Sequence, residues 1–85
     1  MAWTIEYDPR ALRDLRKLPD DVQRRIVDYM DNRVAVVPRS VGDALTDVRK
    51  LWRYRVGDYR IICRIEDKRV VVLVVQIGHR REVYR

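Results

Sequence analysis

Hydrophobic residues first recur at every second position and then at helical spacing. Residues 3–7 alternate apolar and polar side chains, which predicts a half-buried strand. Residues 8–18 carry an apolar stripe of helical period, with Asp8 placed to cap the helix and Pro9 at its first position. This stripe consists of Ala11, Leu12, Leu15 and Leu18.

A second helix is expected directly after Pro19, which ends the first one. Asp20 followed three residues later by Gln23 matches a capping box. The short connection predicts a helical hairpin. The apolar stripe of the second helix consists of Val22, Ile26, Tyr29, Met30 and, by extension, Val34.

The second half of the chain predicts a loop and three strands. Residues 36–50 contain proline, serine and glycine without a regular period, so a loop is expected there. Strands at 51–56 and 59–66 are joined by Gly57-Asp58, a pair suited to a tight hairpin turn. The β-branched run at 69–77 predicts the most buried strand of the sheet.

These elements predict a single domain over residues 1–85, of the α+β class. We expect a two-helix hairpin packed on one face of a small, mainly antiparallel four-stranded sheet. The expected order along the chain is β-α-α-β-β-β.

Arginine alternates with aromatic residues in the stretch "LWRYRVGDYR", residues 51–60. Period two sends Trp52 and Tyr54 under the helices and the arginines to the open face of the sheet. Neighbouring like charges destabilise a sheet, so the cluster favours a bound anion over the alternative of a solvated basic face. The arginines expected on the open face are Arg53, Arg55, Arg60 and Arg64.

Charge and composition limit the kinds of binding partner that we expect. The net charge of +6 favours a polyanion, with nucleic acid first and an acidic protein next. No apolar run is long enough for a membrane span, and we expect no membrane partner. The single cysteine, Cys63, is compatible with a reducing cytoplasm, where we expect the protein to act.

The end of the sequence, "GHRREVYR", adds candidate residues for chemistry. His79, Arg80 and Arg81 directly follow the last predicted strand, and Tyr84 is close behind. Histidine titrates near neutral pH, so His79 is a candidate proton acceptor. A stacking or packing role for the same residue is equally compatible with the sequence.

Several familiar kinds of active site are disfavoured. One histidine and one cysteine do not make a standard zinc site, and no P-loop or dinucleotide-binding glycine pattern is present. No paired carboxylates suggest a magnesium-dependent nuclease, so we expect no metal and no cofactor. RNA can be cut without a metal, because its 2′-OH can attack the adjacent phosphate while arginines neutralise the developing charge.

Together, "DPRALRDLRKLP", "LWRYRVGDYRII" and "IGHRREVYR" resemble the RelE/ParE superfamily of toxins, and most closely its RelE branch. The resemblance covers nearly the whole chain. It implies a small RelE-like α+β fold and a toxin of a type II toxin–antitoxin system that cuts mRNA in the ribosomal A site. It also implies two partners, the ribosome with its mRNA and a cognate RelB-like antitoxin.

The resemblance also implies roles for individual residues. Arg81 matches the arginine that protonates the leaving group or stabilises the transition state, with Arg80 as the second choice, and Tyr84 matches a tyrosine that orients the cut nucleotide. The RNA-binding residues expected are Arg53, Arg55, Arg64 and Arg80. The catalytic residues expected are Arg81, Tyr84, Arg60 and His79.

Two other functions remain open at this point. The ParE branch shares the fold and poisons DNA gyrase, although such a toxin does not need a cluster of phosphate-binding arginines. A non-catalytic RNA-binding module is the other alternative. It is disfavoured because Trp52, Tyr54 and Tyr59 are expected in the core, not on the surface.

Overall fold

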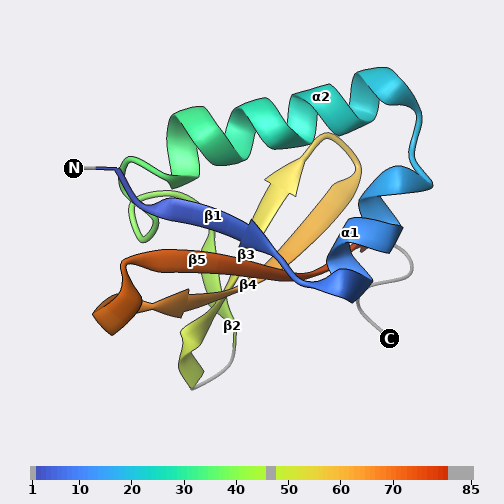
Figure 1. Ribbon diagram of the computed structural model, residues 1–85. Helices are drawn as coiled ribbons and strands as arrows, with labels where there is room; N and C mark the ends of the chain where they lie inside the picture. Colours follow the sequence, from blue (N-terminus) through green and yellow to red (C-terminus); the bar gives the residue numbers. More distant parts are fainter. Residues whose placement is uncertain (1, 46–47, 81–85) are drawn as a thin grey trace.

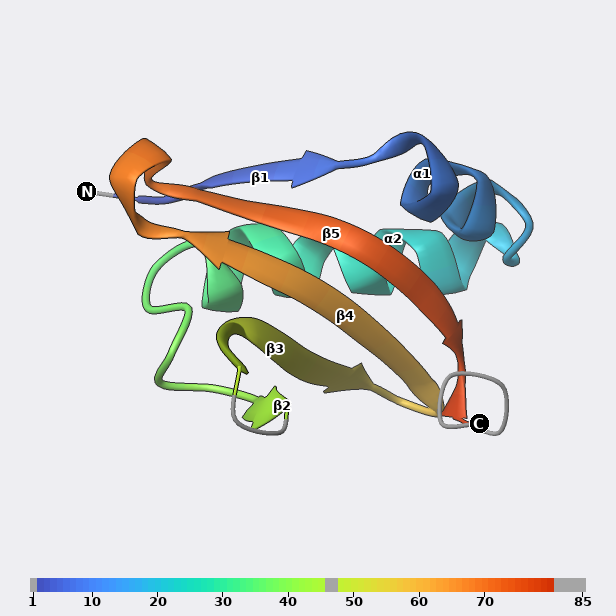
Figure 2. The ribbon, with the colours of Figure 1, turned by 90° about the horizontal axis from the view of Figure 1, so that it is seen from below.

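The computed structural model describes residues 2–45 and 48–80 and shows a five-stranded sheet with two helices on one face (Figures 1 and 2). The helices are α1 (Pro9–Arg16) and α2 (Asp20–Tyr29). The strands are β1 (Thr4–Tyr7), β2 (Asp43–Leu45), β3 (Val48–Val56), β4 (Tyr59–Glu66) and β5 (Val71–His79). Within the described residues, no helix is long and apolar enough to span a membrane.

The strands lie in the order β1-β5-β4-β3-β2. β1 runs parallel to β5, and the other neighbouring pairs are antiparallel. The predicted class is therefore confirmed, but the predicted count of four strands is wrong. β2 forms the fifth strand inside the segment expected to be a loop, where three residues pair with β3.

Asp8 caps α1 as predicted: its carboxylate accepts a hydrogen bond of 2.8 Å from the Ala11 amide. The predicted capping box of α2 is wrong. Pro19 is the N-cap and makes no side-chain bond, while Gln23 Nε2 donates to the Leu18 carbonyl at 2.7 Å. Gln23 therefore ties α2 to the end of the preceding helix and not to its own cap.

The core lies between the helices and the sheet. α1 packs mainly against β5 and also contacts β1, while α2 contacts β3. The core residues are Ala11, Leu15, Ile26, Met30, Val34, Tyr54, Ile61, Cys63, Val72, Val74 and Ile77. The prediction that the β-branched run at 69–77 forms the most buried strand is wrong: β5 buries four of its nine residues, and β4, the central strand of the sheet, buries four of eight.

An irregularity in β5 lies close to the point where α1 is bonded to this strand. The register between β4 and β5 shifts next to Ile62 and Cys63, so β5 contains one residue more than its partner there. Asp14 of α1 accepts a hydrogen bond of 3.2 Å from the Ile77 amide just beyond this bulge. The carboxylate thereby anchors α1 to the end of β5 that leads to the arginine-rich tail.

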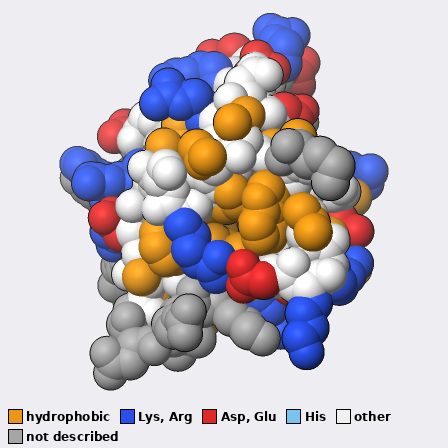
Figure 3. Space-filling view, turned by 90° about the vertical axis from the view of Figure 1, so that its left-hand side faces the viewer, with side chains coloured by type: hydrophobic (Ala, Val, Ile, Leu, Met, Phe, Trp, Pro, Cys, Tyr) orange, Lys and Arg blue, Asp and Glu red, His pale blue; other side chains and the backbone are white. Residues whose placement is uncertain are grey.

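The opposite end of the sheet exposes apolar side chains. Val36, Val37 and Val70 are 56%, 47% and 40% exposed, and Val70 has a φ of 54°, which is unusual for a β-branched residue. Figure 3 looks onto this end of the molecule and shows hydrophobic side chains gathered across it. The β3–β4 turn lies at the other end of the strands, so the apolar end and the arginine-rich hairpin are well separated.

Burial raises the pKa of the Cys63 thiol above its ordinary value of 9.0. An acid whose pKa is raised by folding stabilises the protein fully below its unfolded pKa, and this contribution is lost as the pH rises above that value. The free energy of unfolding should therefore fall by about 1.4 kcal/mol between pH 8 and pH 10 through this thiol.

Urea unfolding of the wild type and of Cys63→Val at the two pH values measures this loss. The variant should lose less stability than the wild type, because it has no thiol to titrate. Equal losses in the two proteins would contradict the assignment to Cys63.

Candidate functional site

The β3–β4 hairpin brings three arginines together on the open face of the sheet. Arg55 and Arg60 are direct cross-strand partners, and Arg53 lies opposite Ile62, two positions farther along. Because side chains alternate between faces, all three arginines point away from Tyr54, which is fully buried under the helices. The predicted juxtaposition of these arginines is therefore observed.

The arginines of this cluster repel one another. Desolvation lowers the pKa of Arg60 below its ordinary value, and the charges of Arg55, Arg53 and Arg80 lower this pKa further. The negative charge of Asp58 raises the pKa of Arg60. A bound anion would relieve this repulsion, since a phosphate accepts hydrogen bonds from several guanidinium groups at once.

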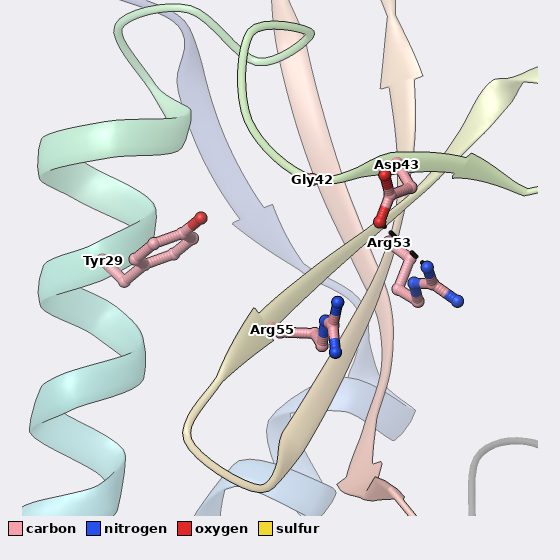
Figure 4. A pocket seen from close by; sticks show the side chains of 5 residues that line it. All are labelled: Tyr29, Gly42, Asp43, Arg53 and Arg55. Atoms are coloured by element: carbon pink, nitrogen blue, oxygen red, sulfur yellow. Dashed lines mark hydrogen bonds and ion pairs between the residues drawn. The ribbon is translucent and has the colours of Figure 1, made fainter.

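A carboxylate already lies at one edge of the cluster. Arg53 Nη2 forms an ion pair with Asp43 Oδ2 at 2.9 Å, and these two residues are cross-strand partners in β2 and β3. Gly42 makes this approach possible, because a Cβ there would lie 2.3 Å from the Arg53 carbonyl oxygen. Figure 4 shows Asp43 and Arg53 joined across the strands.

The same residues line a small cleft beside β3. Its volume is about 240 Å³, and α2 supplies one wall through Tyr29. Figure 4 shows Tyr29 pointing from the helix toward Arg55 and Arg53 on the strand. The cleft is lined by Tyr29, Gly42, Asp43, Arg53 and Arg55. It offers guanidinium groups and one phenol to a ligand held at the edge of the sheet.

Other predicted residues are placed at different distances from this cluster. Arg80 directly follows β5, and its amide donates to the Asp58 carbonyl at 2.8 Å, which holds Arg80 beside the hairpin turn. Arg64 is exposed on the same face as Arg60, but four residues farther along β4, about 13 Å away. Arg64 faces Leu51 and Leu73 on the neighbouring strands and not another arginine.

His79 lies on the opposite face of the sheet from Arg60. It pairs with Tyr59 across β4 and β5, and the two rings meet edge to face with centroids 5.8 Å apart. This contact supports the packing role that the sequence left open. Arg81 and Tyr84 lie outside the described residues, so their predicted roles in catalysis stay predictions.

No group of three or more His, Cys, Asp or Glu side chains suited to a metal occurs within residues 2–45 and 48–80. The groups that converge on the open face are guanidiniums. In chemical terms the face can bind phosphate oxygens and stabilise negative charge that develops on them.

Comparison with known proteins gives the family. The family model described as "ParE toxin of type II toxin-antitoxin system, parDE" matches residues 5–84. The chain belongs to the RelE/ParE family of toxins of type II toxin–antitoxin systems.

Relatives in this family carry RelE-type names. The chain is similar to Toxin RelG of Mycobacterium tuberculosis, with 30% identity over 86 residues that cover 100% of this chain and 99% of the relative. It is also similar to the mRNA interferase toxin RelE of Escherichia coli, with 28% identity over 92 residues that cover 99% of this chain and 92% of the relative.

The RelE/ParE fold is equally clear from solved structures. The crystal structure of the toxin–antitoxin complex RelBE2 from Mycobacterium tuberculosis matches with a TM-score of 0.85 and 28% identity, covering 96% of this chain and 95% of that one. The predicted resemblance and the predicted RelE-like fold are therefore confirmed.

Sequence reasoning missed Asp43 and the edge strand that carries it. Periodicity gives no signal for a three-residue strand, and an ion pair between residues 10 positions apart leaves no local pattern. The available signal was Gly42 directly before Asp43, because a glycine outside a turn often marks a close backbone approach.

Replacing Arg55 with glutamine should have opposite effects on stability and on anion binding. It removes the like charge directly opposite Arg60, so the midpoint of thermal unfolding should rise by roughly 1–6 °C. It also removes one guanidinium from the cluster, so binding of a short RNA should weaken and its salt dependence should become shallower.

Thermal melts and RNA titrations at several salt concentrations measure both effects. Arg64→Gln is the matched control for stability, because it removes the same charge from a position that faces leucines. A midpoint that falls in Arg55→Gln, or rises equally in both variants, would show that the Arg55–Arg60 repulsion is not important.

Proposed function

We propose that this toxin is an mRNA endonuclease that acts in the ribosomal A site. The observation that carries the proposal is the placement of Arg55 directly opposite Arg60, with Arg53 on the same face. Neighbouring like charges on a sheet repel one another, and guanidinium groups placed in this way suit the binding of phosphates. The name of the Escherichia coli relative, an mRNA interferase, supports the same function.

The proposed chemistry uses the RNA as its own nucleophile. The 2′-OH loses its proton to water and attacks the adjacent phosphorus, and the bond to the 5′-oxygen of the next nucleotide breaks as that oxygen gains a proton. No metal-bound water is needed. Arg53, Arg55 and Arg60 bind the phosphates and neutralise the developing charge. Arg81, with Arg80 beside it, stabilises the transition state or protonates the leaving oxygen, and Tyr84 orients the nucleotide.

The remaining predicted residues take supporting roles in this proposal. Arg64 contacts RNA farther along the same face. His79 packs against Tyr59 and is not the proton acceptor, because its ring lies on the other side of the sheet.

We also propose that a cognate antitoxin binds and inhibits this toxin in the cytoplasm. The structurally similar RelBE2 protein was crystallised as a toxin–antitoxin complex. A partner with acidic residues would neutralise part of the +6 charge and compete with RNA for the arginines.

Expression of the toxin alone should arrest growth and cut messages inside translated frames. Mapping of 5′ ends on one message with and without its start codon tests this expectation, because only the translated version brings codons into the A site. Equal cutting of the two messages would contradict ribosome dependence.

A second function is kept because the matching family model is described as a ParE toxin. Intact mRNA together with trapped gyrase–DNA breaks in the same cells would replace the RNA proposal with gyrase poisoning.

The products of cleavage report the nucleophile. Attack by the 2′-OH leaves a 5′-OH on one fragment and a 2′,3′-cyclic phosphate or 3′-phosphate on the other. Cleavage should also persist when EDTA is added to ribosomes stabilised by polyamines. End-labelling of the fragments with and without phosphatase distinguishes the products, and 5′-phosphate ends would rule out this chemistry.

A further inference from the structure

A second cleft lies on the other side of the hairpin, between α2 and the β3–β4 turn. Its volume is about 280 Å³. The helix contributes one wall and the hairpin the other. The lining residues are Val22, Arg25, Val56, Gly57, Asp58 and Tyr59. None of them belongs to the arginine cluster on the open face.

The cleft combines an apolar, aromatic side with a positive charge. Val22, Val56 and Tyr59 are partly buried against the core, so they form a fixed surface. His79 packs edge-on against the Tyr59 ring at 5.8 Å and restricts its movement. The sequence placed Tyr59 in the core, but the structure leaves it half-buried with part of it lining this cleft.

Arg25 lies exposed on α2, over the hairpin turn. Its Nη2 lies 3.6 Å from the position that a Cβ on Gly57 would occupy, so a larger residue at the turn would fill the cleft. Within the described part of the chain, the Arg25 side chain forms no hydrogen bond and no ion pair. Its guanidinium is therefore available to an external anion.

The cleft and the arginine cluster lie on opposite faces of the β3–β4 hairpin and share its turn. Tyr59 and Arg60 are consecutive, so their side chains lie on the two faces of the same strand. Asp58 lines the cleft and its carbonyl oxygen holds the Arg80 amide at 2.8 Å. A single RNA strand bound to the arginine cluster can pass around the narrow turn and place its next nucleotide beside Tyr59.

We propose that this cleft is a subsite for one unstacked nucleotide of RNA, next to the nucleotide that is cut. The base stacks against Tyr59, and its phosphate lies on the Arg25 side, away from the carboxylate of Asp58. Aromatic side chains stack with any base, and arginine supplies the charge that a phosphate requires. The proposal rests on the proposed RNA-cutting function and adds a site for the neighbouring nucleotide.

The test uses ribosomes programmed with mRNA that carries 2-aminopurine at one position in or beside the A-site codon. The A-site codon is 2′-O-methylated, so the mRNA stays intact while the toxin binds. Binding of the wild type should quench the fluorescence at one position, as stacking does. Tyr59→Leu should abolish this quenching and weaken binding at least about fivefold.

Arg25→Ala should weaken binding to a similar extent and make its salt dependence shallower by about one charge. Arg24→Ala is the matched control, since Arg24 is exposed on the same helix but does not line the cleft. Thermal melts check the folding of Tyr59→Leu. Arg25 is exposed, so its variant remains informative even if Tyr59→Leu is destabilised.

Three results would overturn the proposal. The first is that Arg25→Ala and Tyr59→Leu quench the 2-aminopurine fluorescence as strongly as the wild type does. The second is an equal loss of RNA affinity in Arg24→Ala and Arg25→Ala, which would show that any positive charge on α2 has the same effect. The third is loss of antitoxin binding by Arg25→Ala with unchanged RNA binding, which would assign the cleft to the protein partner.

Cleavage of unmodified mRNA by the wild type is measured in parallel. If the wild type cleaves and the two cleft variants bind RNA normally, only the subsite is wrong. If the wild type does not cleave on ribosomes, the proposed function fails and the subsite fails with it.

Discussion

Burial of the Tyr54 side chain under the helices is the constraint on which the rest of the site depends. Tyr54 is fully buried, and its hydroxyl donates to the Pro38 carbonyl at 2.7 Å, so its face of β3 cannot turn outward. A shift of one residue would bury arginine and expose the aromatics. With this register fixed, the tight turn at Gly57-Asp58 sets Arg55 opposite Arg60. The core thus holds like charges together that would otherwise separate.

The aromatic side of β3 also shapes the edge of the site. Trp52 Nε1 donates to the Val41 carbonyl at 2.7 Å, directly before Gly42. Together with the bond from Tyr54 to Pro38, this contact ties the connecting segment to β3. Asp43 therefore lies next to Arg53 and forms an ion pair with it. The residues that stabilise the fold and the arginines proposed to bind phosphate are therefore neighbours on β3, with side chains on opposite faces of the strand.

The sequence alone was sufficient to predict the α+β class, the helical hairpin and the β3–β4 turn, because each of them has a local sequence pattern. The alternation of Arg53 and Arg55 with aromatics and the two-residue turn were enough to place Arg60 beside them. Pairing between distant segments was not predictable in the same way. The three residues of β2 are too few to show a period, and they join the sheet through a close approach that only Gly42 allows.

The cleft at Arg25 illustrates the same limit. Arg25 looks like one of several exposed charges on an amphipathic helix, and nothing in the local sequence relates it to Tyr59. Their proximity arises from how α2 crosses the hairpin. The face occupied by His79 depends likewise on the bulge in β5, which shifts the register by one residue before the strand ends. A histidine after a buried strand gave no indication of which side its ring would take.

The central claim is that the arginine cluster exists to bind the phosphates of the RNA that is cut. Single-turnover cleavage on programmed ribosomes by Arg60→Ala tests this claim most directly. Arg16→Ala, on the exposed side of α1, is the control because it removes the same charge. Thermal melts verify that both variants are folded. We expect Arg60→Ala to reduce cleavage at limiting toxin by at least about tenfold and to show a shallower salt dependence, while Arg16→Ala stays close to the wild type. Equal cleavage by a folded Arg60→Ala and Arg16→Ala would contradict the account.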